Sequence, residues 1–262
     1  MRRYMKVFAL LCKSAAMKEL EHRADFIANT LMSTFWLIWG ILSISIFYGH
    51  TDSIGGWGYY QALIISSMFG LIYGFIETIM QPNARRIAED IQKGALDFVL
   101  VKPIDSMFLV SFRDFLIWRI VDVALALIVI GFALARIDWR FEIAAVAIAL
   151  FMVVNALVIV YSIWLILATL AFWTVQSNNF TDIFRAVYEA ARYPVSVFPA
   201  WLRIGLSFIV PLAFMTTFPV SMALGELPYR YGAYSLAISA TLLIAARVFW
   251  RFALRRYASA SS

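Results

Sequence analysis

Residues 82–105 read PNARRIAEDIQKGALDFVLVKPID, and this charged segment between two long apolar stretches decides how the chain is organised. Its first half is crowded with charged side chains, while Ile87 and Ile91 lie four residues apart and share one helix face. Asn83 is a candidate N-cap and Gly94 a candidate helix stop, so the pattern predicts a short amphipathic helix over 83–94. Such a helix must rest its apolar side on lipid headgroups or on a partner. We interpret it as a docking helix that faces the cytosol.

The composition is that of a membrane protein. The chain has 262 residues, of which 63% are hydrophobic and 15% charged, whereas soluble domains carry about 25% charged residues. No polar stretch is long enough to form a separate catalytic domain, which takes roughly 50 residues or more. The net charge of +6 therefore reflects membrane topology and does not indicate a nucleic-acid partner.

Apolar stretches long enough to cross a bilayer, which needs about 20 residues, recur along the chain. The clear ones are 26–48, 58–80, 115–135, 143–173 and 233–252. Two further stretches, 180–198 and 201–222, compete for one more crossing. The fold class expected is an all-α membrane protein with six transmembrane helices in a single domain, 1–262.

The placement of Lys and Arg predicts the orientation, because basic residues collect on the inner side of a membrane. With the N-terminus inside, most of them fall on the inner side, and the outer loop 49–57 holds none. The exceptions are Arg136, Arg140, Arg203 and Arg230. We therefore expect a multi-pass protein of the cell inner (plasma) membrane with both termini cytoplasmic. Segment 3–21 is expected to be an interfacial helix on the membrane surface, the alternative being an ordinary cytosolic helix.

Small and polar residues inside the spans are candidates for a substrate path or a subunit interface. Ser66, Gly70 and Gly74 recur every four positions, which allows close packing within one subunit or between subunits. Asn155 lies among apolar residues of the fourth span, where a hydrogen bond between helices is favoured over a substrate contact.

Charged residues in the stretch 180–198 share one helix face. Arg185 and Glu189 are four residues apart, with Asp182 and Arg192 spaced to continue the alternation of sign. That face is either solvated at the inner surface or buried against another subunit.

The sequence carries no chemistry of its own. It has no phosphate-binding loop, no nucleophile elbow and no zinc-protease motif. Cys12 is the single cysteine, and the two histidines have no acidic or thiol neighbours at ligand spacing, so no metal site is expected. The chain is not predicted to be an enzyme. If it works against a gradient, energy enters from elsewhere, and the helix at 83–94 is the natural entry point.

Two sequence signatures, in their order and spacing, resemble the permeases of ABC-2 type exporters, most closely the viologen-exporter-like subgroup. The first is Gly94-Ala95-Leu96-Asp97-Phe98 followed by Leu100-Val101-Lys102-Pro103-Ile104. The second is Phe198-Pro199-Ala200-Trp201-Leu202-Arg203 followed by Pro211, Pro219 and Gly225. The resemblance covers nearly the whole chain.

The resemblance implies the permease subunit of an exporter that moves its substrate out of the cytoplasm. The candidate path is lined mainly by Phe, Trp, Met and aliphatic residues, which favours an amphiphilic or hydrophobic substrate. The resemblance makes the helix over 83–94 a coupling helix seated on a separate ABC ATPase subunit, and it assigns to that interface Arg85, Arg86, Ile87, Glu89, Asp90 and Ile91. The chain would bind no cofactor, since ATP and Mg belong to the partner ATPase. A second permease, identical or related, would complete a homo- or heterodimer in the lipid bilayer.

The resemblance also implies that 180–198 is the fifth crossing and 201–222 a re-entrant helical pair before the last span. Hydropathy alone would instead make 201–222 the crossing. The alternative function is an ion-coupled secondary transporter, which needs no ATPase but requires titratable residues near the bilayer midplane.

Overall fold

The computed structural model describes the whole chain except residues 1, 22, 140, 175–176 and 258–262, so Arg140 lies outside the described residues. The described part of the chain is helical, with loops and a single isolated bridge between Ile54 and Trp57. The α-helices are α1 (Arg2–Glu21), α2 (Arg23–Tyr48), α3 (Tyr59–Phe75), α4 (Gln81–Gln92), α5 (Asp97–Leu100), α6 (Ser106–Ser111), α7 (Ile120–Leu134), α8 (Ile143–Thr169), α9 (Ser177–Tyr188), α10 (Ala200–Ile204), α11 (Leu212–Met215), α12 (Thr217–Ala223) and α13 (Arg230–Arg256).

Within the described residues, five helical stretches are long and apolar enough to cross a membrane. They are Ala24–Tyr48, Tyr59–Gln92, Ile117–Leu134, Ile143–Phe172 and Arg230–Arg256. They coincide with the five clear apolar stretches of the sequence, whereas the sixth expected crossing is not a single long helix.

The region between α8 and α13 is broken into short helical pieces. α9 ends at Tyr188 and gives way to 3-10 turns, Glu189–Arg192 and Val195–Val197. The stretch 201–222 is likewise divided among α10, a π-helix at Gly205–Ile209, α11 and α12. Two prolines help to divide it: Pro211 immediately precedes α11 and Pro219 lies in the first turn of α12, where a missing N–H costs little.

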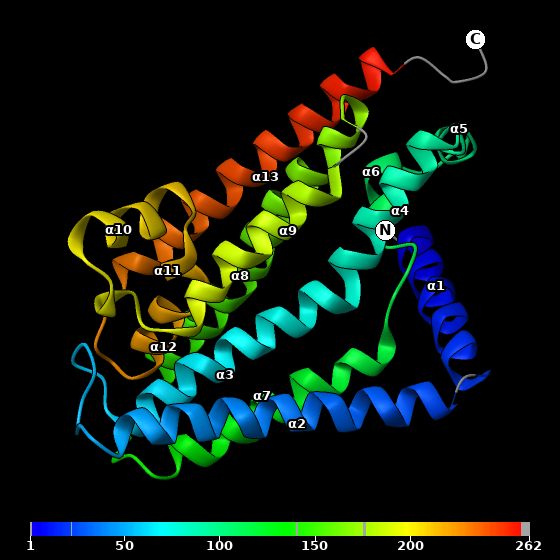
Figure 1. Cartoon of the computed structure of the whole chain (residues 1–262). Helices are drawn as coiled ribbons and strands as arrows, with labels where there is room; N and C mark the ends of the chain where they lie inside the picture. The colour runs from blue at the N-terminus through cyan, green and yellow to red at the C-terminus, as the bar shows by residue number, and fades with distance from the viewer. Residues whose placement is uncertain (1, 22, 140, 175–176, 258–262) are drawn as a thin grey trace.

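The helices pack as a bundle whose core runs along α8 and α13. These two helices lie side by side (Figure 1). The residues of α8 at this core, such as Met152, Ala156 and Ile159, are fully buried. α3 packs on α7, and the glycines of the small-residue stripe lie at this contact. A Cβ added to Gly74 would lie 2.9 Å from Cγ2 of Val123, so the glycine allows close approach within one chain.

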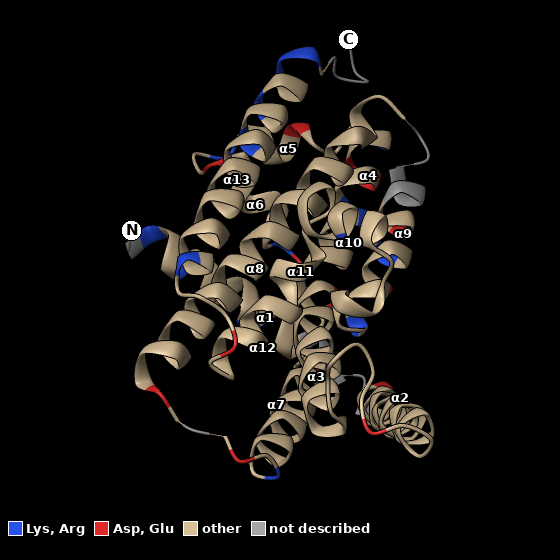
Figure 2. Ribbon diagram, turned by 90° about the vertical axis from the view of Figure 1, so that its left-hand side faces the viewer, with Lys and Arg blue, Asp and Glu red and all other residues tan. Residues whose placement is uncertain are grey.

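Figure 1 shows two different ends of the bundle. α4, α5 and α6 lie at one end together with the C-terminal end of α13, while α10, α11 and α12 lie at the other. α9 starts near the first end and leads towards the second. In Figure 2 the ribbon of α13 is tan along most of its length and carries its blue Lys and Arg segments towards its C-terminal end.

The N-terminal helices differ in how they contact the rest. α1 packs through aromatic rings, with Phe8 edge-on to Phe112 and Phe115, so part of its apolar face rests on this chain itself. α2 contacts α3 and α7, yet none of the residues in its most apolar 18-residue stretch is buried.

Candidate functional site

The predicted docking helix is not a separate helix but the end of the second spanning helix. α3 continues through a π-helical turn, Ile76–Met80, directly into α4. Pro82 has no N–H to offer the carbonyl of Thr78, and the N–H of Leu116 donates to that carbonyl instead at 3.0 Å. The helix thus passes through a proline without leaving a carbonyl unpaired, and any tilt of α4 is carried into the span.

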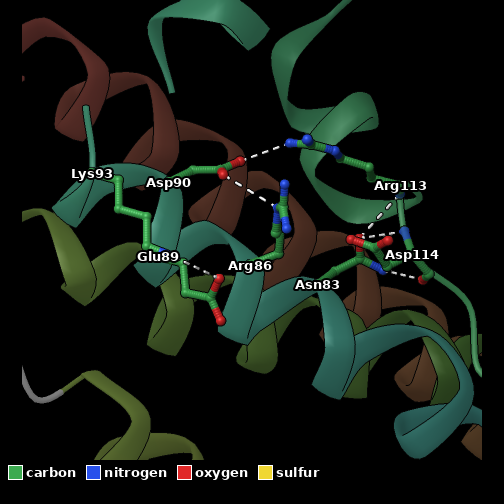
Figure 3. A network of polar contacts seen from close by, with 7 residues as sticks. All are labelled: Asn83, Arg86, Glu89, Asp90, Lys93, Arg113 and Asp114. Atoms are coloured by element: carbon green, nitrogen blue, oxygen red, sulfur yellow. Dashed lines mark hydrogen bonds and ion pairs between the residues drawn. The ribbon is translucent and has the colours of Figure 1, made fainter. Parts of the chain in front are cut away.

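Asn83 is not an N-cap, because it lies inside this continuous helix, and its amide has another use. The side-chain Nδ2 donates to the carbonyl oxygens of Ile79 at 2.6 Å and Asp114 at 2.7 Å. Its Oδ1 accepts from the backbone N–H groups of Arg113 and Asp114, both at 3.0 Å (Figure 3). One buried amide therefore fastens the segment after α6 to α4.

A second contact between α4 and the segment after α6 lies about two helical turns further along α4, at Asp90. Its Oδ2 accepts from Nη1 of Arg113 at 2.7 Å, and its Oδ1 lies 3.3 Å from Nε of Arg86 (Figure 3). Asp90 is 5% exposed. A buried carboxylate paired with two guanidinium groups holds its helix firmly against the neighbouring segment, since breaking one pair leaves a charge poorly compensated.

The apolar side of α4 rests on this chain rather than on lipid. Ile87 and Ala84 are buried in the same cluster as Trp164 and Leu165 of α8. Of the residues assigned to a partner interface, Ile87 and Asp90 are therefore buried inside the chain, and Ile91 is partly buried.

The remaining assigned residues, Arg85, Arg86 and Glu89, are exposed on α4, as is Lys93 at its C-terminal end. Glu89 pairs with Lys93 at 3.4 Å, and Arg86 pairs with Asp90. Within the described residues, Arg85 makes no ion pair, so it offers a free positive charge at the surface.

The helix ends at Gly94, as the sequence predicts. Gly94 has φ +67°, and the next N–H, that of Ala95, donates back to the carbonyl of Asp90 at 2.8 Å. The chain then turns into α5, where Leu96 is fully buried, while Lys102 and Pro103 are exposed. Asp97 lies in the first turn of α5.

Two apolar residues of this turn were missed as site residues. Phe98 is 78% exposed and Val101 is 85% exposed, in the segment that follows α4 in the chain. Their spacing of three on a short helix between charged residues is a signal that the sequence does contain. We call Arg85, Arg86, Glu89, Lys93, Phe98 and Val101 the α4–α5 surface.

A buried ion cluster lies where the span turns into α4. Glu77, in the π-helical turn, is 5% exposed and approaches Arg119 at 3.3 Å and Arg185 at 3.0 Å. The contact with Arg185 is an ion pair that does not meet the geometry of a hydrogen bond. Arg119 also pairs with Asp122 at 3.2 Å. The cluster links the second span to the start of α7 and to α9.

The other candidate path residues have partners within the chain. Arg185 turns to Glu77 and to the hydroxyl of Tyr73, whereas Glu189 pairs with Arg192 at 3.0 Å. The charges on this face thus form two separate sets of ion pairs rather than one continuous row.

Asn155 of α8 donates to Ser235 at 3.2 Å and accepts from Ser239 at 2.9 Å, both on α13, so it joins two helices of one subunit. Gly70 packs at ordinary contact distance, its Cβ position 3.8 Å from that of Ala126.

The second signature shapes the far end of the bundle. Phe198 packs partly buried against the core, Pro199 precedes α10, and Arg203 is exposed on that helix. Gly225 has φ +76° and ends α12, with the N–H of Glu226 donating to the carbonyl of Ser221 at 2.9 Å. These residues set the turns of the broken region rather than a reactive centre.

Comparison with known families gives one match, to a family described as ABC-2 family transporter protein, over residues 34–261. The match runs from within α2 to the C-terminus and includes α4, the ion cluster and the broken region. A comparison with individual curated proteins gives no match.

Proposed function

This chain belongs to the ABC-2 family of transporter proteins, and we propose that it is the permease subunit of an ATP-driven exporter that moves an amphiphilic or hydrophobic substrate out of the cytoplasm. A member of this family is a component of membrane transport, and such permeases generally work with an ABC ATPase subunit. The observation that carries the proposal is the α4–α5 surface at one end of a spanning helix.

The α4–α5 surface has the composition of a docking site. It combines the unpaired charge of Arg85 with the exposed side chains of Phe98 and Val101. Large apolar residues surrounded by charges at a surface mark contacts with another protein. We assign the ATPase partner to this surface, with Phe98 and Val101 entering a groove and the charges of α4 fixing the orientation. The subgroup resemblance to viologen exporters supports the direction of transport.

The orientation follows from the charges. The C-terminal end of α13 carries Arg247, Arg251, Arg255 and Arg256, and it lies at the same end of the bundle as α4 (Figure 1). Because basic residues favour the inner side, we assign the α4–α5 surface and both termini to the cytoplasm. An even number of crossings then requires a sixth. We assign it to the stretch 180–198, which leads from the α4 end of the bundle to the other, and we take 201–222 as re-entrant.

The continuous helix supplies the mechanism. ATP binding closes the ATPase pair and moves α4 at the end of the second span. Since α3, the π-helical turn and α4 form one helix, that movement tilts the span and shifts the protein between an inward-facing and an outward-facing state. A second permease, identical or related, would flank the path, and ATP and Mg would be held by the ATPase.

The alternative of an ion-coupled secondary transporter would need a carboxylate that is free to take up an ion. Glu77 is the buried carboxylate in the second span, but Arg119 and Arg185 already hold it. The geometry therefore favours a fixed structural ion pair over a site for a transported ion.

The test is affinity purification of the chain from its native membrane in mild detergent. We expect a stoichiometric ATPase to co-elute with the wild type and to be lost in the double variant Arg85→Glu, Phe98→Asp, because both side chains are exposed and neither change disturbs the core. The matched control is Arg230→Glu, an exposed arginine at the opposite end of the bundle, at the start of α13. Co-elution that survives the double variant would remove the assignment of the partner to this surface.

A further inference from the structure

A cavity of about 650 Å³ separates α2 from the bundle. One wall is the apolar helix α2, with Trp36 and Trp39 among its lining residues, and the other is formed by α3, the start of α7 and the end of α9. Sites for small organic ligands usually measure about 300–1,000 Å³. The cavity is therefore large enough for a ligand, and its two walls differ in chemistry.

The polar wall contains three arginines, Arg119, Arg185 and Arg192. The carboxylates near them are already occupied. Glu77 is held by two of the arginines, Asp122 lies 3.2 Å from Arg119, and Glu189 lies 3.0 Å from Arg192. A cationic ligand would have to displace an arginine from its carboxylate, so this wall is poorly suited to a cation.

Hydrogen-bond donors, in contrast, are left over. Arginine has five N–H donors, and the ion pair of Arg192 with Glu189 uses its Nη2, while 39% of the Arg192 side chain is exposed. Each guanidinium lies over an aromatic ring, Arg119 at 4.1 Å from Trp118 and Arg192 at 5.0 Å from Phe69. Acceptor oxygens of an anionic group can bind the donors that the ion pairs leave free, and bonds between ionised partners are the stronger kind.

The rest of the cavity suits a hydrocarbon chain. Its lining also includes the apolar side chains of Ile41 and Ile44 on α2 and of Leu63 on α3. Gly40 also faces this space, and a Cβ placed there would meet nothing within 4 Å. A ligand that fills the cavity therefore needs a polar head and an apolar tail.

We propose that this cavity binds an amphiphile with an anionic, oxygen-bearing head group, which accepts hydrogen bonds from Arg119 and Arg192 while its hydrocarbon chain lies along α2. The inference rests on the proposed function only in naming the substrate class. The binding itself is a property of this chain and needs no ATPase.

The test uses the full chain, purified in a neutral detergent, and the fluorescence of its tryptophans. Bromine quenches tryptophan at contact, and Trp36 and Trp39 line the cavity. We expect saturable quenching by dibromostearate and much weaker quenching by a dibrominated alkyltrimethylammonium of the same chain length. Equal or stronger binding of the cationic probe would overturn the head-group assignment.

Two pairs of variants locate the site. Arg192→Gln removes a proposed contact with the head group and should weaken dibromostearate binding about tenfold or more. The fold should tolerate this change, because the partner Glu189 is exposed and the buried ion pairs are kept. The control Arg247→Gln removes an exposed arginine that is paired at 3.7 Å with Asp105 outside the cavity and should leave binding unchanged.

Gly40→Leu should fill the cavity and abolish saturable quenching. Gly131→Leu is its control, since this glycine also has open space around its Cβ position but does not line the cavity. Binding unaffected by both Arg192→Gln and Gly40→Leu would overturn the proposal. ATPase co-elution without probe binding refutes the cavity alone, and probe binding without an ATPase partner refutes the proposed function alone.

Discussion

Asp90 of α4 and Arg113, in the segment after α6, form an ion pair 2.7 Å long that ties the end of the second span to the chain preceding α7. Arg113→Gln leaves the buried Asp90 with only Arg86, so we expect a loss of roughly 1–3 kcal/mol in stability. The control Lys93→Gln removes a pair on the same helix that is exposed on both sides and should cost less than about 0.5 kcal/mol. Thermal unfolding in detergent compares the two. Equal midpoints would show that the Asp90 pair does not fasten α4.

Loss of the Asn83 side chain should destabilise the protein more than loss of Arg113, because all the hydrogen bonds of its amide are within the chain. Asn83→Ala leaves two carbonyls and two N–H groups without this partner, and we expect a loss of about 2–4 kcal/mol. Gln81, two residues away, is also buried, but its Oε1 has no partner. Gln81→Met should therefore change stability by less than about 1 kcal/mol. The same unfolding measurement would contradict this reasoning if the two variants behaved alike.

Replacement by alanine should affect stability differently at Gly74 and at Gly70, the two glycines of the small-residue stripe. In Gly74→Ala the new Cβ would lie 2.9 Å from Cγ2 of Val123, so α3 and α7 must separate, at a cost of roughly 1–3 kcal/mol. In Gly70→Ala it would lie 3.8 Å from Ala126, an ordinary contact, and stability should be nearly unchanged. Thermal unfolding of the single variants decides. A destabilised Gly70→Ala with a normal Gly74→Ala would contradict the packing of these helices.

The sequence predicted the end of α4 but not its beginning, and the difference is physical. Gly94 ends the helix because its backbone adopts φ +67°, which is a local property of one residue. The start is not local. Pro82 and Asn83 look like a helix beginning, yet the N–H of Leu116 satisfies the carbonyl that the proline leaves open. Only the tertiary structure supplies that donor, so a separate helix was expected where one continuous helix exists.

The long spans could be predicted from hydropathy, whereas the ion cluster around Glu77 could not be predicted from the sequence. Glu77 and Arg185 are more than a hundred positions apart in the chain, and nothing local relates them. The spacing of Arg185 and Glu189 favoured a pair on one helix, but the desolvated Glu77 competes more strongly for the guanidinium. The exposed Phe98 and Val101 were missed because their spacing between charged residues is a weak signal in a chain that is apolar along most of its length, and their exposure is known only from the structure.

The fifth crossing can be assigned by labelling single cysteines, because Cys12 is the only native cysteine. In a Cys12→Ser background, Ala200→Cys lies between the two competing stretches and is exposed. If 180–198 crosses and 201–222 is re-entrant, an impermeant maleimide added to intact cells should label it. If 201–222 crosses instead, this cysteine stays on the inner side and is protected. Glu226→Cys should be labelled and Lys102→Cys protected in both cases, and both residues are exposed. Labelling of Lys102→Cys from outside would reverse the orientation and, with it, remove the α4–α5 surface from the reach of a cytoplasmic ATPase.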